Sequence, residues 1–396
     1  MDTITSLFDS DAAKPKAKAA GKTIPLNVRA VLWARAAGHC QYTDCNRLLI
    51  GDLLSGSPHA NLAAIAHIIA DSKDGPRGDE ILSPRLATDI ANLMLLCDVH
   101  HRVIDSHDRV HGHPVERLRE MKRLHEERVA IVTSITEDQG CHVVRFAARI
   151  GVNESPVAKD AIAVSLLPHR YPVDGGWIDL DVATLELADH EPGFWQIHVK
   201  NLRKAFAEKV RGRMERGEIK RLAVFGLAPM PLLFELGRLI SGISTAEVRQ
   251  LHKSPKSWAW QGSEPAIEFE VKWPEAFGEI VALKLEVSSG ITDERVTGAI
   301  GDVPIWSIAA TGAHNDIMRR PEDLATFAKL FRGTLDEIKA RHGENVELHV
   351  FPSVPVSVAV EAGRSWQPKA HPPLIIHDQN RTLGGFVRAH TIAQES

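Results

Sequence analysis

The stretch Asn92-Leu-Met-Leu-Leu-Cys-Asp-Val-His-His-Arg-Val-Ile-Asp105 decides how the first third of this 396-residue chain is organised. Its first six residues form a short apolar run of strand length, and the residues from His100 onward are typical of the start of a helix. Cys97 and His100 have the spacing of one half of a zinc site, which needs a second pair of soft ligands. A strand that leads into a metal-binding helix is therefore expected here.

The second pair of zinc ligands lies upstream. The other closely spaced cysteines are Cys40 and Cys45, in Cys40-Gln-Tyr-Thr-Asp-Cys45, and Cys141 is the one cysteine left over. Three cysteines and one histidine are a common ligand set for structural zinc. The sequence therefore predicts a structural zinc ion bound by Cys40, Cys45, Cys97 and His100. A zinc knuckle without further chemistry is the simpler alternative, but it would not explain His67 or Asn92.

Three residues around this strand and helix indicate chemistry. His67 lies in the apolar, strand-like run Ala64-Ile-Ala-His-Ile-Ile-Ala70, where a lone histidine is more often a satisfied core residue than a catalyst. His101 and Asp105 are four residues apart, so on a helix they lie on one face and could hold a second metal ion. The helix dipole is an alternative explanation for Asp105.

His67, Asn92 and His101, in this order, resemble the motif of HNH endonucleases. The resemblance implies a ββα-metal fold, in which two strands carry the first His and the Asn and a helix carries the second His. It implies that His67 is the general base that activates water and that Asn92 orients His67 through its side-chain amide. It also implies that His101 and Asp105 hold a catalytic cation, Mg²⁺ or another divalent ion. Many such enzymes have a ligand immediately before the first His, where this chain has Ala66, so the cation would have fewer protein ligands.

Composition limits the class of protein. The chain is 44% hydrophobic and 25% charged, which is ordinary for a soluble globular protein of two or three domains. It has no apolar run of membrane-spanning length and no signal-peptide-like apolar segment at its start, and its few cysteines suit a reducing cytoplasm. We therefore expect a cytoplasmic protein without membrane contact. A net charge of −4 gives no general attraction to DNA, so a nuclease would need local basic surface.

Three segments are expected from composition: a disordered basic arm, the endonuclease domain and an α/β domain, at residues 1–22, 23–136 and 137–396. Within the second segment, Asn27 is expected to cap a helix that ends near Ala37. Arg77, in a loop rich in Gly and Pro, is a candidate contact to the scissile phosphate. Pro114 is expected to begin a helix whose basic side chains either face solvent or follow a DNA backbone.

After about residue 137, predicted strands alternate with predicted helices, which favours a mostly parallel sheet covered by helices. The strands are expected at 178–182, 221–225, 267–271, 281–287, 305–309, 346–351 and 374–376. The helices are expected at 194–216, 229–240, 321–341 and 355–363.

An internal repeat lies within this alternation. Leu222–Arg238 aligns without a gap onto Leu348–Arg364, with seven of seventeen positions identical. The identical pairs are Leu222/Leu348, Val224/Val350, Phe225/Phe351, Pro229/Pro355, Glu235/Glu361, Gly237/Gly363 and Arg238/Arg364. The repeat predicts a duplicated α/β unit with two similar halves.

Each copy of the repeat predicts a strand, a short loop and a helix with Pro near its first turn. Free backbone N–H groups there would meet at the carboxyl edge of a sheet, where α/β proteins bind phosphate. Two such sites suit a ligand with two phosphates in a ring, although the prolines could simply begin helices. The candidate contacts are Ala228, Pro229, Met230, Ser288, Ser289, Gly290, Ser353 and Val354. Candidates for stacking on bases are Trp177, Trp258, Trp260, Trp306 and Trp366, although most buried tryptophans belong to the core.

An HNH-like domain followed by a duplicated α/β domain resembles the HNH–SAVED effectors of CBASS antiphage signalling. SAVED domains resemble two fused CARF-like, Rossmann-like units that sense cyclic di- or trinucleotides. The resemblance implies a cyclic-nucleotide-activated endonuclease that cuts double-stranded DNA without much sequence preference and acts in abortive infection as a homo-oligomer. Two alternatives stay open: a zinc-stabilised nucleic-acid-binding regulator that cuts nothing, and a restriction-type HNH endonuclease whose C-terminal domain recognises modified DNA.

Overall fold

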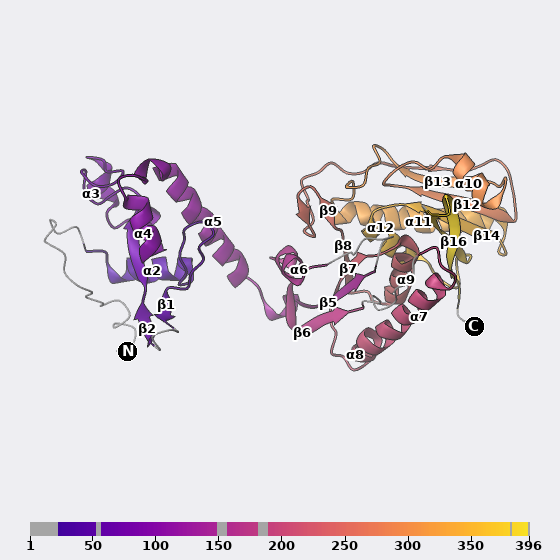
Figure 1. Ribbon diagram of the computed structural model, residues 1–396, viewed down its shortest axis with the longest axis horizontal. Coiled ribbons are helices and arrows are strands. Elements are labelled where there is room, and N and C mark those ends of the chain that lie inside the picture. Colours follow the sequence, from indigo (N-terminus) through magenta and orange to yellow (C-terminus); the bar gives the residue numbers. More distant parts are fainter. Residues whose placement is uncertain (1–22, 53–56, 149–156, 181–188, 381, 395–396) are drawn as a thin grey trace. The chain divides into compact units, whose positions relative to one another are not determined.

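The computed structural model describes the chain except for residues 1–22, 53–56, 149–156, 181–188, 381 and 395–396. Contacts divide the chain into two compact units, Met1–Ile135 and Thr136–Ser396, and each has its own secondary structure (Figure 1). The arm expected at residues 1–22 lies outside the described residues. Among the described residues, no helix is long and apolar enough to cross a membrane.

The first unit is an α+β region. Its elements are α2 (Leu26–Ala36), β1 (Ile50–Asp52), β2 (Ser57–Asn61), β3 (Ala63–His67), α3 (Leu82–Leu86), β4 (Leu93–Cys97), α4 (Asp98–Asp105) and α5 (Val115–Thr133). β3 and β4 pair antiparallel, with Ala63 opposite Cys97 and His67 opposite Leu93. Every side chain of β4 is buried, as its unbroken apolar run predicts, and α4 contacts both strands. The strand and the helix expected from the opening stretch are therefore present.

The predicted cap of α2 is wrong, because the helix begins after Pro25 and has no side-chain cap. The carbonyl of Pro25 accepts the first helical hydrogen bond, from Arg29 N at 3.0 Å. A proline fits this position because its fixed φ suits a helix start. The helix ends where Ala37 adopts a left-handed conformation, φ 49°.

α5 begins directly after Pro114, as expected. Part of its basic face is neutralised within the helix: Arg123 forms ion pairs with Glu120 and Glu127, and Lys122 forms one with Glu126. Lys122 is buried, so its pair lies inside the protein, whereas the Arg123 pairs are exposed and typical of a solvated helix surface. They favour the alternative in which the basic side chains of α5 face solvent over the one in which they follow a DNA backbone.

The second unit is an α/β domain with two largely parallel sheets. Its strands are β5 (Gly140–Ala147), β6 (Tyr171–Asp179), β7 (Leu222–Leu227), β8 (Ala246–Arg249), β9 (His252–Lys253), β10 (Lys256–Ser257), β11 (Phe269–Lys272), β12 (Ile280–Glu286), β13 (Ile305–Ala310), β14 (Glu347–Ser353), β15 (Leu374–Asn380) and β16 (Gly385–Ile392). Its α-helices are α6 (Lys159–Leu166), α7 (Phe194–Phe206), α8 (Gly212–Glu215), α9 (Met230–Ile240), α10 (Asp293–Ile300), α11 (Pro321–His342) and α12 (Val356–Ser365). The helix expected to run unbroken from Phe194 is interrupted by a π-helical turn at Ala207–Arg211.

The first sheet has the order β6-β5-β7-β8 and is entirely parallel. The second has the order β11-β13-β12-β14-β15-β16, with four parallel inner strands and antiparallel strands at both edges. One buried apolar cluster includes side chains of both sheets, such as Val224 of β7 and Val350 of β14. The two sheets therefore share a core.

The two copies of the repeat form β7 with α9 and β14 with α12, and the two helices pack directly against each other. A Cβ atom on Gly237 would lie 1.9 Å from the carbonyl oxygen of Val360, and one on Gly363 would lie 1.9 Å from that of Phe234. Any side chain at these positions would force the helices apart. Close packing of α9 on α12 therefore explains why glycine occupies this position in both copies.

Candidate functional site

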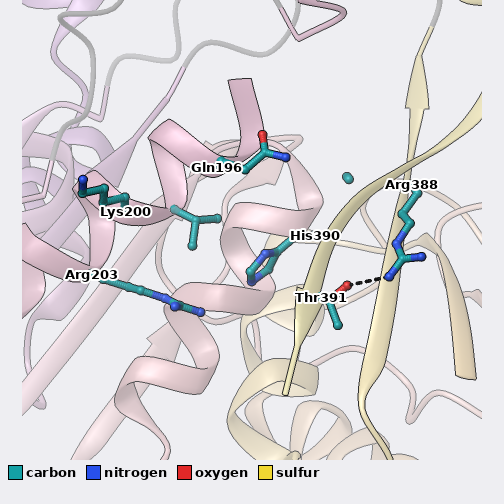
Figure 2. Close-up of a pocket in the computed structure, with 8 residues that line it drawn as sticks. Gln196, Lys200, Arg203, Arg388, His390 and Thr391 are labelled. Atoms are coloured by element: carbon teal, nitrogen blue, oxygen red, sulfur yellow. Dashed lines mark hydrogen bonds between the residues drawn. The ribbon is translucent and has the colours of Figure 1, made fainter. Parts of the chain in front are cut away.

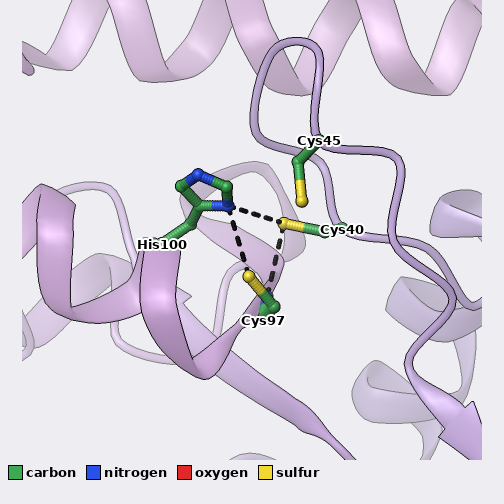
Figure 3. Close-up of side chains that lie close together, drawn as sticks. All are labelled: Cys40, Cys45, Cys97 and His100. Atoms are coloured by element: carbon green, nitrogen blue, oxygen red, sulfur yellow. Dashed lines mark hydrogen bonds between the residues drawn. The ribbon is translucent and has the colours of Figure 1, made fainter.

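The four predicted zinc ligands come together in the first unit. Cys40 and Cys45 lie in the loop after α2, Cys97 ends β4, and His100 lies in the first turn of α4. Their ligand atoms are all within 4.8 Å of one another, with 3.2 Å between Cys97 Sγ and His100 Nδ1 (Figure 3). The donor set and the tight cluster fit a structural zinc ion. The prediction that these four residues come together in a group that could hold a metal ion is confirmed.

The electrostatics of the cluster also suit a cation. Cys40 is completely buried, and burial raises the pKa of its thiol to about 12. Without a cation the sulfur would stay protonated, whereas zinc binds the thiolate. The backbone N–H of Cys97 points to Cys40 Sγ at 3.3 Å and would stabilise negative charge there.

Two aromatic residues that sequence reasoning missed hold His100 in place. The Tyr42 ring stacks on the His100 ring, with 4.0 Å between centroids and an angle of 4° between the planes. The Tyr42 hydroxyl donates to His113 Nε2 at 3.0 Å, and His113 Nδ1 donates to the Arg109 carbonyl at 2.9 Å. The available signal was the position of Tyr42 between the two cysteines, since contacts behind the ligands orient metal-binding histidines.

His67 lies at the end of β3, and only one of its ring nitrogens bonds the main chain. Its Nε2 lies 2.9 Å from the Ala87 carbonyl oxygen. A carbonyl only accepts hydrogen bonds, so Nε2 carries the ring proton of the neutral imidazole. Nδ1 is then the basic nitrogen, which can accept a proton.

Asn92 does not orient His67 as the HNH resemblance implies. Its side-chain oxygen accepts from the N–H of Ile69 at 2.9 Å, and its nitrogen donates to the carbonyls of Ile69 and Leu86 at 2.8 and 3.2 Å. Both N–H groups of the amide are therefore used by the main chain. Asn92 fixes the backbone two residues beyond His67, and so acts on the position of the strand end.

Arg77 is not an exposed phosphate contact, because only 7% of its side chain is accessible. Its guanidinium donates to the carbonyls of Ile68 at 2.6 Å and Ile104 at 2.7 Å. One nitrogen, Nη2, contacts both Asp105 Oδ1 at 2.6 Å and the His67 carbonyl at 3.4 Å. Arg77 therefore ties the end of β3 to the end of α4.

His101 and Asp105 lie on one face of α4, as expected. His101 Nε2 is 3.7 Å from Asp105 Oδ2, while Asp105 Oδ1 is bound by Arg77. Within the described part of the chain, no third ligand atom from His, Cys, Asp or Glu lies within 4.8 Å of both. A nitrogen and an oxygen donor suit a divalent cation that keeps several water ligands.

In the second unit, a cavity of about 310 Å³ lies at the carboxyl ends of β7, β12 and β14. It brings together three of the predicted contact residues, Met230, Ser288 and Val354. Close to it, Ser289 Oγ is 2.8 Å from Ser353 Oγ, and the N–H of Ser288 donates to the Ser353 carbonyl at 2.7 Å. Loops after strands of both sheets therefore line one cavity.

Other predicted ligand contacts, at the starts of α9 and α12, lack most of the free backbone N–H groups that were expected there. Ala228 is fully buried in the core, and Pro229 has no N–H to donate. In α9, Pro231 also lacks an N–H, and the N–H groups of the next two residues bond the Pro229 carbonyl. At α12, the N–H of Ser357 is taken by the side chain of Gln250 at 3.1 Å. Each helix start therefore offers one free backbone donor: the N–H of Met230 in α9 and the N–H of Val356 in α12.

The tryptophans are mainly core residues. Trp306 is 2% exposed, and its indole nitrogen donates to His342 Nε2. Trp258 and Trp366 are equally buried, and Trp260 lines a different cavity. Trp177 lies on β6 with the Lys159 ammonium 5.5 Å from its ring centre, and it is not among the residues that line the 310 Å³ cavity. None of the tryptophans lines this cavity.

The cationic residues of the cavity were missed. Lys253 and Lys256 face each other across the short β9–β10 hairpin, and both line the cavity together with Gln250, His252 and Asn315. The available signal was a pair of lysines that flank the Ser254-Pro255 turn. Two ammonium groups at one side of a cavity would attract phosphate.

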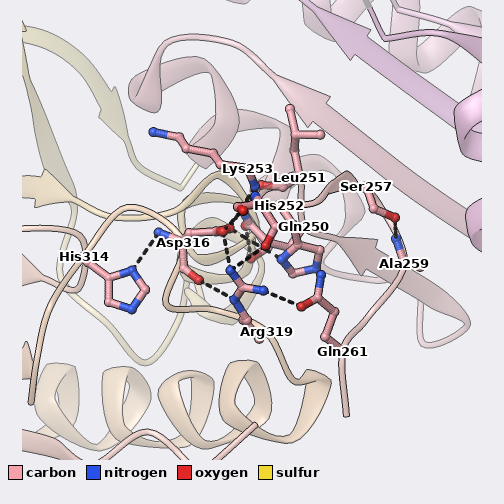
Figure 4. Close-up of polar contacts among 12 residues, drawn as sticks. Gln250, Leu251, His252, Lys253, Ser257, Ala259, Gln261, His314, Asp316 and Arg319 are labelled. Atoms are coloured by element: carbon pink, nitrogen blue, oxygen red, sulfur yellow. Dashed lines mark hydrogen bonds and ion pairs between the residues drawn. The ribbon is translucent and has the colours of Figure 1, made fainter. Parts of the chain in front are cut away.

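A half-buried ion pair between Asp316 and Arg319 holds this hairpin (Figure 4). Asp316 accepts hydrogen bonds from the N–H groups of Lys253 at 3.0 Å and Ser254 at 3.2 Å. Arg319 pairs with Asp316 and donates to the Ser254 carbonyl at 3.0 Å. His252 is fully buried, with Nδ1 3.7 Å from Asp316. These contacts set where the two lysines lie.

Comparison with known proteins identifies part of the chain. Residues 202–392 match the family model of SAVED, the "SMODS-associated and fused to various effectors sensor domain". These residues therefore form a SAVED sensor domain. A search of curated proteins found no match.

Solved structures of a receptor from Acinetobacter baumannii, the Cap4 SAVED/CARF-domain containing receptor, are also similar. The structure with the cyclic trinucleotide 2'3'3'-cAAA has 12% identity and a TM-score of 0.41, and the match covers 71% of this chain and 61% of the receptor. The structure with 3'3'3'-cAAA has the same identity and TM-score, over 62% of the receptor. The match thus spans less than two thirds of the receptor's length.

Proposed function

We propose that this protein is a DNA endonuclease of the HNH type whose activity is switched on by a cyclic di- or trinucleotide bound to its SAVED domain, as an effector of antiphage defence. The family match over residues 202–392 supports the sensor part. One observation carries the nuclease part: the buried guanidinium of Arg77 contacts both the main chain of His67 and the carboxylate of Asp105. This contact supports the proposal that His67 acts as the base beside a cation ligand, Asp105.

The reaction is hydrolysis of a phosphodiester. A water oxygen attacks phosphorus, one ester oxygen leaves with the electrons of the broken bond, and that oxygen takes a proton from solvent. His67 Nδ1 accepts the proton of the attacking water, because Nε2 is committed to Ala87. His101 and Asp105 would hold the divalent cation, which when bound supplies positive charge beside the phosphate oxygens. Arg77 and Asn92 fix the main chain around His67, so the base is positioned before DNA arrives.

The 310 Å³ cavity is the proposed site of the cyclic nucleotide. Lys253 and Lys256 supply charge for the phosphates, and the first N–H groups of α9 and α12 point from two helix starts. Because loops after strands of both sheets line the cavity, one ligand would contact both. Such a ligand can favour one arrangement of the domain over another, which is what switching requires.

Replacing Lys253 and Lys256 together by Ala should weaken cyclic-nucleotide binding about 100-fold. Each charge-assisted hydrogen bond to a phosphate contributes on the order of 1.5 kcal/mol, and two are lost. Calorimetric titration of the full chain measures the change. The control Lys204→Ala/Lys329→Ala removes two lysines that do not line the cavity, and should bind normally. Unchanged affinity in the Lys253/Lys256 variant would show that the ligand binds elsewhere.

The whole proposal is tested by incubating the purified protein with supercoiled plasmid, Mg²⁺ and a panel of cyclic di- and trinucleotides. Plasmid should be degraded only with the matching ligand, and light scattering on the same samples should show a larger assembly. A single HNH site cuts one strand, so bringing two or more together explains double-strand breaks. Full cleavage without ligand, or activation at constant mass, would contradict this account. A restriction-type enzyme would instead cut without added nucleotide and depend on DNA modification.

A further inference from the structure

A second hollow of the SAVED domain has an unusual lining. It has a volume of about 590 Å³ and lies between α7 and the edge strand β16. Lys200 and Arg203 come from α7, and Arg388 and His390 come from β16, and none of the described residues that line the hollow is acidic (Figure 2). It shares no lining residue with the 310 Å³ cavity. The hollow is therefore a separate, basic site.

The charge beneath the hollow is fixed. Glu235 is completely buried and is bonded by Arg203 at 2.7 Å, Arg238 at 2.6 Å and His390 at 2.9 Å. Burial alone would raise the pKa of Glu235, but the hydrogen bonds from His390, Arg238 and Arg203 outweigh it and hold the pKa at about 2. Glu235 therefore stays ionised beneath the hollow, where it balances part of the positive charge of Arg203, Arg238 and His390.

Lys200 and Arg388 add to this positive charge. Over the residues that the structure describes, Lys200 has no acidic partner, and the contact of the Arg388 guanidinium is a 3.4 Å hydrogen bond to Thr391 Oγ1. Among the described residues, therefore, no acidic side chain neutralises these two charges on opposite walls. A concave surface of one sign concentrates ligands of the opposite sign.

The repeat provides an internal comparison. Glu361 is the counterpart of Glu235 and pairs with Arg364 at 3.4 Å. Burial raises the pKa of Glu361, so the cations around it do not compensate for desolvation. The positive charge added to the hollow by Lys200 of α7 and Arg388 of β16 lies outside the repeated segment. Packing of the repeat does not require it.

We propose that this hollow binds an oligophosphate, either free or as the triphosphate of a nucleotide. Arginine presents paired N–H donors that match phosphate oxygens, and lysine adds a point charge. The volume of about 590 Å³ leaves room for more than one phosphate group. The lining has no Phe, Tyr or Trp on which a base could stack, so the phosphates and not the base are read.

The test uses inorganic tripolyphosphate and calorimetric titration of the full chain carrying Lys253→Ala/Lys256→Ala, so that the 310 Å³ cavity contributes no charge-assisted binding. One molecule should bind per chain, and binding should weaken as salt is raised. Adding Lys200→Ala/Arg388→Ala should lower the affinity at least tenfold. Neither side chain contacts Glu235, so the buried ion pairs stay intact.

The matched control adds Lys204→Ala/Lys329→Ala to the same background and should leave the affinity unchanged. Lys204 lies on α7 but outside the lining of the hollow. ATP should bind as tightly as tripolyphosphate. Absence of binding, equal affinity in the Lys200/Arg388 variant, or a strong preference for ATP would each overturn the proposal. None of these outcomes depends on cyclic-nucleotide binding or DNA cleavage.

Discussion

Replacing Cys97 by Ser should abolish zinc binding and unfold the first unit of the chain, while the second unit stays folded. Cys97 is a buried member of a group of four residues whose sulfur and nitrogen atoms lie within 4.8 Å of one another. A structural zinc ion contributes on the order of 10 kcal/mol to folding, which exceeds the whole stability of many domains. The apolar core around this cluster is also small, so it has little reserve.

Metal analysis and thermal unfolding of the full chain measure this effect. The wild type should contain about one zinc ion per chain and lose it with a strong chelator, together with the unfolding transition of the first unit. Cys141→Ser is the matched control, because Cys141 is a buried cysteine of the second unit outside the metal cluster. A Cys97→Ser protein with normal melting and no metal would rule out the zinc site.

His67→Ala should lower DNA cleavage by about 10²- to 10⁴-fold, the usual contribution of a general base. The variant lacks the nitrogen that accepts the proton of the attacking water. Its fold should be kept, because β3 is held by its pairing with β4 and by Arg77, which bonds the main chain of His67 and Ile68. The loss should therefore appear in the rate of cleavage and not in stability.

The measurement compares plasmid cleavage by ligand-activated wild type and variant, with zinc content and melting temperature determined on the same preparations. His111→Ala removes an exposed histidine of the same unit and should cut at the wild-type rate. Cyclic-nucleotide affinity should be equal in all three proteins, since the sensor cavity lies in the other unit. Wild-type cutting by His67→Ala would remove its assignment as the base.

Residue type and spacing in the sequence predicted those features of the structure that depend on short, contiguous segments of the chain. Cys40, Cys45, Cys97 and His100 could be found because the chain has only four cysteines and His100 lies three residues after one of them. The buried strand β4 followed from its unbroken apolar run, and α9 and α12 followed from prolines ahead of apolar helical patterns. The repeat also pointed to Gly237 and Gly363, although not to their helix contact.

The assignments that failed involve partners far apart in the sequence. Arg77 was expected to contact DNA, but its partners Asp105 and Ile104 lie on a helix that folds back against β3. Trp306 was expected to stack on a ligand, but its indole is buried against His342. In each case a polar or aromatic side chain found a partner inside the protein, which satisfies buried polar groups at a lower cost in free energy than leaving them unpaired.

The sequence by itself determined the ligands of the metal cluster, the α/β character of the second unit and the position of its repeat, because these depend on residue type, period and spacing along the chain. Only the tertiary structure decided that Asn92 bonds the main chain, that Arg77 is a buried clamp and that Lys253 and Lys256 line the cavity. Those roles depend on which distant segments meet. Lys253 and Lys256, for example, are positioned by hydrogen bonds from their hairpin to Asp316, some sixty residues further along the chain. Local sequence patterns do not predict a contact between segments so far apart.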